Sequence, residues 1–185
     1  VTGLPRTRPL PTVGRERFSA WFRHRPRVRI TARQGTVALV PTCIVEYTAP
    51  SVGADIVGVY ERNGIEIAPV AVGCCGAPLL QRGDLDGFTA TATAVVATLV
   101  ERVRAGEHVV VAQPTCALTI RRDYPDHLGS AAAAQVAAVT ADVSEYLLRL
   151  HRTDERRLDT TFVGDIPSAI TYVAPCHVRA QRIGL

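Results

Sequence analysis

Short apolar, β-branched runs alternate with longer segments of helical periodicity along this chain, and this alternation limits the fold more than any other feature. The predicted strands are residues 36–40, 65–70, 107–112 and 169–173. The predicted helices are residues 51–62, 84–104 and 131–150. Strands that alternate with helices in this way form parallel sheets covered by helices. The sequence therefore predicts an α/β fold, a layered domain with a mostly parallel sheet.

Local signals mark the ends of several predicted helices. Ser51 and Ser130 stand where N-caps are expected, because a serine hydroxyl accepts a hydrogen bond from the first free backbone N–H groups of a helix. Asn63-Gly64 is a typical helix end. These signals leave the order of the strands in the sheet open.

Positive charge is concentrated near the N-terminus. The chain has 185 residues, of which 21 are basic, all of them arginine, and 17 are acidic, so the net charge is +4. Residues 1–33 hold nine arginines and one glutamate, a net charge of +8, and the remainder carries −4. A basic segment can bind nucleic acid, but arginine replaces lysine throughout, and Phe18, Trp21 and Phe22 look like packing anchors. We therefore expect residues 1–35 to be a connector, with no nucleic acid as partner.

The composition is that of a domain with a sizeable buried core, since 47% of the residues are hydrophobic. No apolar run is long enough to span a membrane, and no signal peptide is recognisable. The first residue is not Met and the last residues stop within a pattern, so we expect a piece of a longer polypeptide. The predicted location is the cytoplasm, or the inner face of the cell membrane through a partner.

All five cysteines follow predicted strands. They occupy four positions: Cys43, the adjacent Cys74 and Cys75, Cys116, and Cys176. The carboxyl ends of parallel strands meet at one edge of a sheet, and ligand sites gather there. We therefore expect the cysteine loops to converge at that edge.

Several explanations fit a group of cysteines. Small buried hydrophobic residues are one, although chance would not place all five at strand ends. A disulfide framework is disfavoured by the odd number and the missing secretory signal. A nucleophilic cysteine with His177 or His108 as its base leaves four cysteines unexplained. Thiolates in this number suit zinc or an iron–sulfur cluster, and a cluster accounts for all of them most economically.

Other residues near the cysteines are candidates for cofactor contacts. Gly73, Gly76 and Pro114 are predicted to shape tight loops whose backbone N–H groups approach the cofactor. His177 is predicted either to hydrogen-bond a cluster sulfur or to cap the next helix. Three arginines also lie close to the cysteines in sequence: Arg121, Arg122 and Arg179. They either offset the charge of a cluster or form a solvated surface.

The cysteine spacing resembles that of a known family. Cys43 is followed after thirty residues by Cys74-Cys75-Gly76-Ala77-Pro78, and after forty more by Pro114-Thr115-Cys116. This pattern is similar to the cysteine-rich CCG domain of heterodisulfide reductase and glycolate oxidase iron–sulfur subunits. It most resembles the iron–sulfur subunits of the anaerobic glycerol-3-phosphate dehydrogenase group.

The resemblance implies a domain organisation and a function. Residues 1–35 would connect to an upstream ferredoxin-like module, residues 36–165 would be a first CCG domain, and residues 166–185 would begin a truncated second repeat. The implied function is an iron–sulfur electron-transfer subunit of a flavin-dependent respiratory dehydrogenase, relaying electrons towards quinone. The implied partners are a flavin-containing dehydrogenase subunit and a membrane-anchored or quinone-reactive protein.

One position departs from the family pattern. The family has Cys-x-x-Cys at its third cysteine position, whereas this chain has Thr119 three residues after Cys116. The implied metal ligands are Cys43, Cys74, Cys75 and Cys116, which suffice for a [4Fe-4S] cubane or a variant of it. Cys176 either joins this site or belongs to a second one. Two alternatives stay open, a heterodisulfide- or quinone-reducing catalytic module on the cluster and a structural zinc-binding domain.

Overall fold

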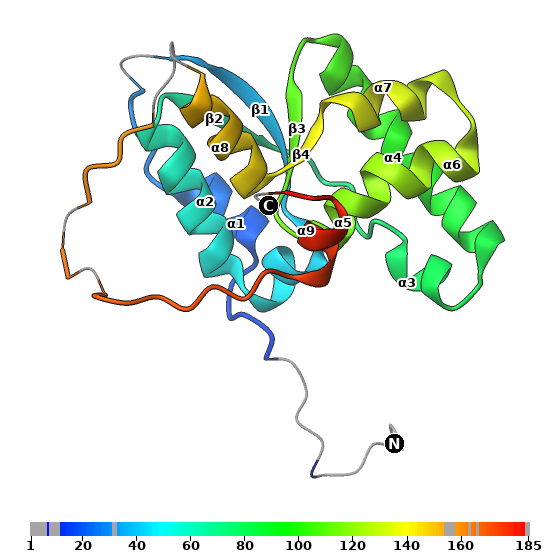
Figure 1. Ribbon diagram of the computed structural model, residues 1–185, viewed down its shortest axis with the longest axis horizontal. Helices are drawn as coiled ribbons and strands as arrows, with labels where there is room; N and C mark the ends of the chain where they lie inside the picture. The colour runs from blue at the N-terminus through cyan, green and yellow to red at the C-terminus, as the bar shows by residue number, and fades with distance from the viewer. Residues whose placement is uncertain are drawn as a thin grey trace.

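Four parallel strands form one sheet at the centre of the computed structural model (Figure 1). They are β1 (Gly35–Val40), β2 (Ile65–Pro69), β3 (His108–Val111) and β4 (Thr140–Asp142), in the order β2-β1-β3-β4. The structure describes residues 7, 12–30, 33–153, 158–162, 164–165 and 167–183. Each neighbouring pair of strands runs parallel, so the predicted α/β fold with a parallel sheet is confirmed.

Helical segments connect and cover the strands. In the described residues they are α1 (Phe18–His24), η1 (Ile44–Thr48), α2 (Pro50–Arg62), α3 (Ala77–Gln81), α4 (Leu85–Arg104), α5 (Pro114–Leu118), η2 (Thr119–Asp123), α6 (Tyr124–Leu128), α7 (Ala131–Val139), α8 (Val143–Arg152) and α9 (Cys176–Ala180). The segments η1 and η2 are single π-helical turns. No helix in the described part of the chain combines the length and apolar character that crossing a membrane requires.

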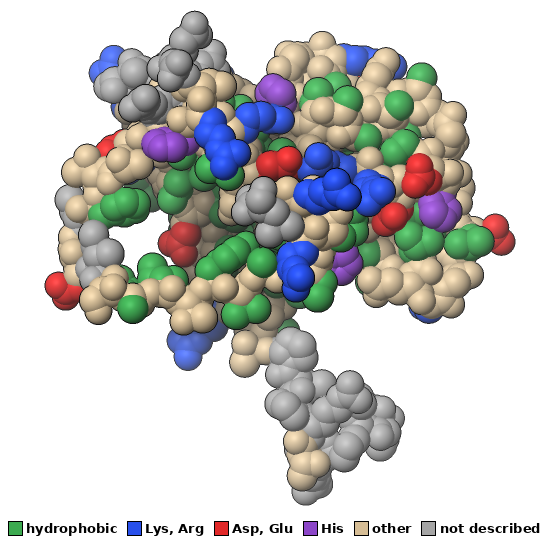
Figure 2. All heavy atoms as spheres, viewed as in Figure 1, with side chains coloured by type: hydrophobic (Ala, Val, Ile, Leu, Met, Phe, Trp, Pro, Cys, Tyr) green, Lys and Arg blue, Asp and Glu red, His purple; other side chains and the backbone are tan. Residues whose placement is uncertain are grey.

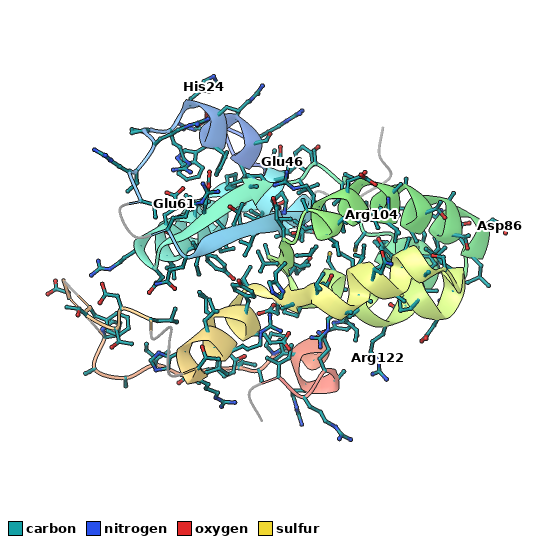
Figure 3. The ribbon with its side chains drawn as sticks, turned by 90° about the horizontal axis from the view of Figure 1, so that it is seen from above. His24, Glu46, Glu61, Asp86, Arg104 and Arg122 are labelled. Atoms are coloured by element: carbon teal, nitrogen blue, oxygen red, sulfur yellow. The ribbon has the colours of Figure 1, made fainter. Side chains whose placement is uncertain are left out.

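Both faces of the sheet are covered, as the views in Figures 1 and 3 agree. On one face, α1, α2 and α8 pack around a core that includes Phe18, Tyr60 and Tyr146. On the other face, α4 and the helices from α5 to α7 pack around Phe88 and Tyr124. The apolar stripes of the helices thus bury both sides of the sheet in a three-layer domain.

The two connections that join the first three strands cross opposite faces of the sheet. The connection from β1 to β2 runs through α2 on one face, and the connection from β2 passes through α4 on the other face to β3, on the far side of β1. Doubly wound folds bind their ligands at the carboxyl ends of the strands, next to such a reversal of strand order. Here the reversal lies between the neighbouring strands β1 and β3.

The prediction of one helix over 131–150 is wrong, because a strand interrupts it. Residues Thr140–Asp142 pair with β3 as strand β4. Asp142 then begins α8 with a capping box, in which its side chain accepts from the Ser144 N–H and Glu145 accepts from the Asp142 N–H. Three residues are too few to disturb the apolar periodicity of the two helices, so this strand cannot be recognised from the sequence pattern.

The predicted caps have mixed outcomes. Ser130 caps α7, and its hydroxyl accepts from the Ala133 N–H at 3.2 Å. Ser51 does not cap α2, because Pro50 already occupies the first turn and Ala49 is the N-cap. Proline at the start of a helix needs no N–H partner and has a suitable φ, so the helix starts one residue early.

The predicted strand 169–173 is not a strand. Its place beside β3 is taken by β4, and the segment runs as extended chain with Ile170, Tyr172 and Val173 exposed. β-branched composition makes a strand only where a neighbour is available for pairing. Cys176 therefore does not follow a strand, and it begins α9, which packs on α5.

Part of the predicted basic connector is built into the core. Phe18 of α1 is fully buried, and its ring lies where a side chain on Gly53 would be, 2.4 Å from the position of an added Cβ. Arg25, at the end of α1, forms a buried ion pair with Glu61 of α2 at 2.5 Å. The more distal Arg6 and Arg8 lie outside the described residues.

Candidate metal centre

Three strand-end loops bring four cysteines together at the carboxyl edge of the sheet. Cys43 follows β1, Cys74 and Cys75 follow β2, and Cys116 lies in α5 after β3. Burial raises the pKa of Cys43, and the nearby Cys74 and Cys75 thiols raise it further. Cys43, Cys74 and Cys75 also raise the pKa of Cys116, so the four side chains share one electrostatic environment at the carboxyl edge of the sheet.

Cys75 and Cys116 form the buried half of this group. Their Sγ atoms lie 3.0 Å apart, within hydrogen-bonding contact of two thiols. This hydrogen bond lowers the pKa of Cys75 to about 7, and the same bond together with burial raises the pKa of Cys116. Cys43 and Cys74 are exposed. The group thus has a dry side and a side that faces solvent.

The Cys-Cys-Gly turn has a backbone shape that requires glycine. Gly76 has a φ of 81°, and an added Cβ would lie 3.0 Å from Cδ2 of Phe88. Its N–H donates to Cys74 Sγ at 3.4 Å. Gly73, on the other side of the pair, has a φ of 71° but open space around it. Gly76 therefore lets the loop pack closely on α4 while its N–H points at a cysteine sulfur.

Tyr124 supports the loop of the buried Cys75 through a hydrogen bond to its backbone. Its hydroxyl donates to the Cys75 carbonyl oxygen at 2.9 Å, and its ring packs against Phe88. Burial raises the pKa of Tyr124, so the hydroxyl stays protonated and remains a donor. The sequence does not reveal this residue, because the contact joins positions 49 residues apart.

Thr42 has a strained backbone directly before Cys43. Its φ of 69° is rare for a β-branched residue. Its side chain is buried, and Oγ1 has no hydrogen-bond partner in the described part of the chain. Such strain is kept where the surrounding structure requires it, often at functional sites. Here it sets the direction in which Cys43 leaves the end of β1.

Two π-helical turns accompany the cysteines. Cys43 immediately precedes η1, and η2 begins three residues after Cys116. Thr119, which replaces the family cysteine, is the first residue of η2 and is buried. Single π-turns are often found at functional sites, and no local sequence pattern indicates either turn.

The C-terminal helix lies beside the third cysteine loop. His177 Nδ1 and Thr115 Oγ1 are 3.0 Å apart, and the Gln181 amide donates to the Pro114 carbonyl at 3.3 Å. Cys176 is exposed at the first position of α9. No group of three or more histidine, cysteine or acidic side chains in the described residues is already arranged to hold a metal ion.

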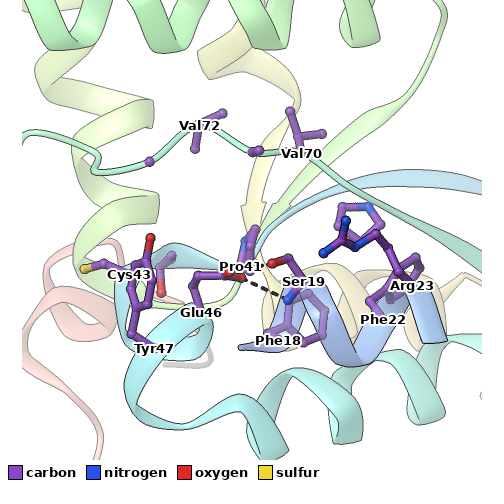
Figure 4. Close-up of a pocket in the computed structure, with 14 residues that line it drawn as sticks. Phe18, Ser19, Phe22, Arg23, Pro41, Cys43, Glu46, Tyr47, Val70 and Val72 are labelled. Atoms are coloured by element: carbon purple, nitrogen blue, oxygen red, sulfur yellow. Dashed lines mark hydrogen bonds between the residues drawn. The ribbon is translucent and has the colours of Figure 1, made fainter. Parts of the chain in front are cut away.

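A cavity of about 600 Å³ opens beside Cys43 (Figure 4). Aromatic and aliphatic side chains line most of it: Phe18, Phe22, Tyr47, Val70 and Val72. Ser19 of α1 donates through its hydroxyl to Glu46 at 2.6 Å, and its N–H donates to the same carboxylate at 3.1 Å. This clamp joins α1 to the turn that follows Cys43, so the two walls of the cavity are fixed to each other.

The chain is similar to a known protein family and to several known proteins. Residues 37–121 match the family model of the cysteine-rich domain CCG. The chain is 29% identical over 149 residues to a fumarate reductase (CoM/CoB) subunit of Methanothermobacter marburgensis, covering 77% of this chain and 26% of that protein. It is 27% identical over 185 residues to an anaerobic glycerol-3-phosphate dehydrogenase subunit of Escherichia coli, covering 93% of this chain and 42% of that protein.

A third relative has a different name. Lactate utilization protein A of Bacillus pumilus is 29% identical over 156 residues, with 80% of this chain and 60% of that protein covered. The chain thus spans between 26% and 60% of the length of these three relatives. No solved structure matches significantly. The matched region contains Cys43, Cys74, Cys75 and Cys116, and over this region the chain is similar to the cysteine-rich domain CCG.

Proposed function

We propose that this chain is an iron–sulfur electron-transfer subunit of a multi-subunit oxidoreductase. The observation that carries the proposal is the convergence of four cysteines from three strand-end loops at the carboxyl edge of the sheet. Four thiolates are the ligand set of a [4Fe-4S] cluster. The names of the relatives, a fumarate reductase subunit and a glycerol-3-phosphate dehydrogenase subunit, support an oxidoreductase role.

The proposed ligands are Cys43, Cys74, Cys75 and Cys116, whose thiolates are the kind of donor that such a cofactor requires. When bound, the cluster supplies one-electron oxidation and reduction. The Gly76 N–H donates to Cys74 Sγ, and donors of this kind stabilise added negative charge on ligand sulfur. The unpartnered hydroxyl of Thr42 offers a second donor next to Cys43. Tyr124 holds the Cys75 loop and helps to exclude water from its buried side.

The chain acts within a complex in this proposal. The electron donor is a flavin-containing dehydrogenase subunit, and the electrons pass towards quinone or a quinone-reactive, membrane-anchored partner. Two relatives are named as subunits, which supports the presence of partner chains. The complex then lies in the cytoplasm or at the inner face of the cell membrane.

The proposal also assigns roles along the chain. Residues 36–165 form one cysteine-rich repeat, residues 1–35 connect it to a ferredoxin-like module, and residues 166–185 begin a second repeat. Cys176 belongs to that second repeat and lies outside the four-thiolate site. Its place in the chain, at the start of α9 after the last strand of the sheet, supports this assignment.

Metal analysis of anaerobically purified protein tests the proposal. We expect about four irons and a brown colour for the wild-type chain. Cys75→Ser should lose most of the iron while the fold is retained, whereas the matched variant Cys176→Ser should keep it. Stoichiometric zinc without visible absorption would assign a structural zinc domain instead, and full iron in Cys75→Ser would contradict ligation by the Cys-Cys pair.

The cavity beside Cys43 favours a second candidate function, a catalytic module that reduces a small molecule at the cluster. Its apolar and aromatic lining suits a quinone or an organic disulfide. A purely structural metal site would need no such cavity. Reduced methyl viologen supplies electrons in the test. Its oxidation in the presence of a quinone analogue or a model disulfide, by the isolated iron-loaded chain, would indicate catalysis, and a pure relay should show none.

A further inference from the structure

A basic groove with a volume of about 720 Å³ lies on the Cys116 side of the molecule. One side of it is formed by η2 and α6, the other by the end of α9, and α7 lies between them. Its lining residues are Arg121, Arg122, Pro125, Ala134, Ala137, Ala138, Ala180, Gln181 and Arg182. Figure 2 shows blue side chains gathered on this face beside α9. No carboxylate is among the described residues that line the groove.

The arginines of this groove differ in how they are bound. Arg121 is fixed, because it donates to Glu145 at 2.7 Å and to Gln181 at 3.3 Å. Arg122 and Arg182 are exposed and have no ion pair or hydrogen bond to any side chain that the structure describes. Arg122 projects away from the body of the protein in Figure 3. Two guanidinium groups are therefore available to a partner.

The groove is attached to the segments that carry the cysteine centre. Arg122 follows Cys116 by six residues through α5 and η2, roughly 9 Å at the rise of a helix. The opposite side, α9, is held on α5 by the Gln181–Pro114 and His177–Thr115 contacts. Anything bound in the groove thus lies close to the Cys116 loop.

The floor of the groove is shallow and made of small residues. Ala134, Ala137 and Ala138 lie on one face of α7 and leave space for a main chain or a helix to approach closely. Positive charge around such a hollow attracts acidic surfaces and speeds their encounter. Contacts between electron-carrier proteins are small and depend on this kind of complementarity.

We propose that the groove docks the acidic surface of a protein that carries single electrons on a flavin or iron–sulfur group. This rests on the proposed function, because the four cysteines would hold the iron–sulfur cluster that accepts one electron from the docked carrier. The carrier would be oxidised by one electron and that cluster would be reduced by one, with no bond formed or broken. Arg122 and Arg182 make the ionic contacts, and the alanines of α7 accept the surface between them.

Flavodoxin, an acidic FMN protein, serves as the probe. Its affinity for the full chain is measured by titration at low salt and at about 0.15 M salt, where charges are screened beyond about 8 Å. The charge-reversed variant Arg122→Glu/Arg182→Glu should bind about tenfold more weakly than wild type. The variant Arg122→Lys/Arg182→Lys, which keeps the charge, should stay within about threefold of wild type.

Arg27→Glu/Arg29→Glu is the matched control. These arginines are also exposed and carry the same charge, but they lie between α1 and β1, away from the groove. We expect this variant to change affinity less than about twofold. Equal loss in both reversed variants, or no measurable binding by wild type, would overturn the proposal. Binding of polyuridylate that is lost in the same groove variant would assign the surface to nucleic acid instead.

A second measurement separates this proposal from the function on which it rests. Flavodoxin hydroquinone is mixed with iron-loaded protein, and the rate of electron transfer is followed by absorbance. A preparation without iron refutes the proposed function, while the binding measurement still reports on the groove. A loaded protein whose rate and affinity are the same in the groove variant as in wild type refutes only the docking surface.

Discussion

The two sides of the cysteine centre differ in chemistry. On the Cys43 side, a cavity of about 600 Å³ is lined mostly by aromatic and aliphatic side chains. On the Cys116 side, a groove of about 720 Å³ is lined by arginine and alanine. Two chemically different surfaces therefore lie near one centre: the first suits an apolar small molecule, and we propose the second as the docking site of an acidic protein.

The two sides also differ in how firmly they are held. The α1 wall of the cavity is part of the core, through fully buried Phe18 and the buried Arg25–Glu61 pair. The α9 wall of the groove is held by polar contacts of His177 and Gln181 and by buried Val178. The α1 wall therefore belongs to the hydrophobic core of the domain, whereas the α9 wall packs on its surface.

The ion pairs of the two sides give the largest expected difference. Glu61→Gln leaves Arg25 buried without its counter-charge, and we expect a loss of about 3–5 kcal/mol in the free energy of unfolding. Glu145→Gln weakens the half-exposed pair with Arg121 and should cost less than about 1 kcal/mol. Denaturant unfolding of both variants measures the two losses. Equal losses would mean that α1 is no more firmly built into the domain than the groove side.

The two glycines that flank the Cys-Cys pair give the next largest expected difference in stability. Gly76→Ala combines backbone strain of about 1–2 kcal/mol with a clash on Phe88, so about 2–4 kcal/mol is expected in total. Gly73→Ala has the same strain but faces open space beside the cavity, so about 1–2 kcal/mol is expected. Chemical denaturation compares the two. A larger loss for Gly73→Ala would contradict the close packing of the loop on α4.

The sequence predicted the parts of this site that depend on local pattern. Three strands, and the placement of Cys43, Cys75 and Cys116 after them, follow from short β-branched runs that end at glycine or proline. Parallel strands then bring these ends to one edge without any knowledge of the strand order. The convergence could therefore be predicted from topology alone.

The sequence could not predict features that depend on contacts between distant residues. The strand Thr140–Asp142 is fixed by pairing with β3, and the exposed segment 169–173 has strand composition without a neighbour. The support of Cys75 by Tyr124 and the strained φ of Thr42 are set by packing around them. The local propensity of these residues contains no information on such contacts.

A matched pair of tyrosine variants distinguishes the two sides most specifically. Tyr124→Phe removes the donor to the Cys75 carbonyl on the Cys116 side, and Tyr60→Phe removes the donor to the Val143 carbonyl on the α1 face, at 2.8 Å. Each change deletes one neutral hydrogen bond of a buried tyrosine, so each should cost about 1–3 kcal/mol, because an unpaired carbonyl stays behind. Both rings remain in place, which makes the two variants a matched pair.

Only one of these tyrosines supports a cysteine loop, so iron retention should separate them. Under the proposed function, Tyr124→Phe loosens the Cys75 loop and should release iron several times faster to a chelator than wild type does. Tyr60→Phe should release iron at the wild-type rate, although its stability falls by a similar amount. Absorbance of the iron–chelator complex over time measures both rates. Similar release from the two variants would show that the hydrogen bond to the Cys75 carbonyl stabilises the fold without positioning the ligand loop.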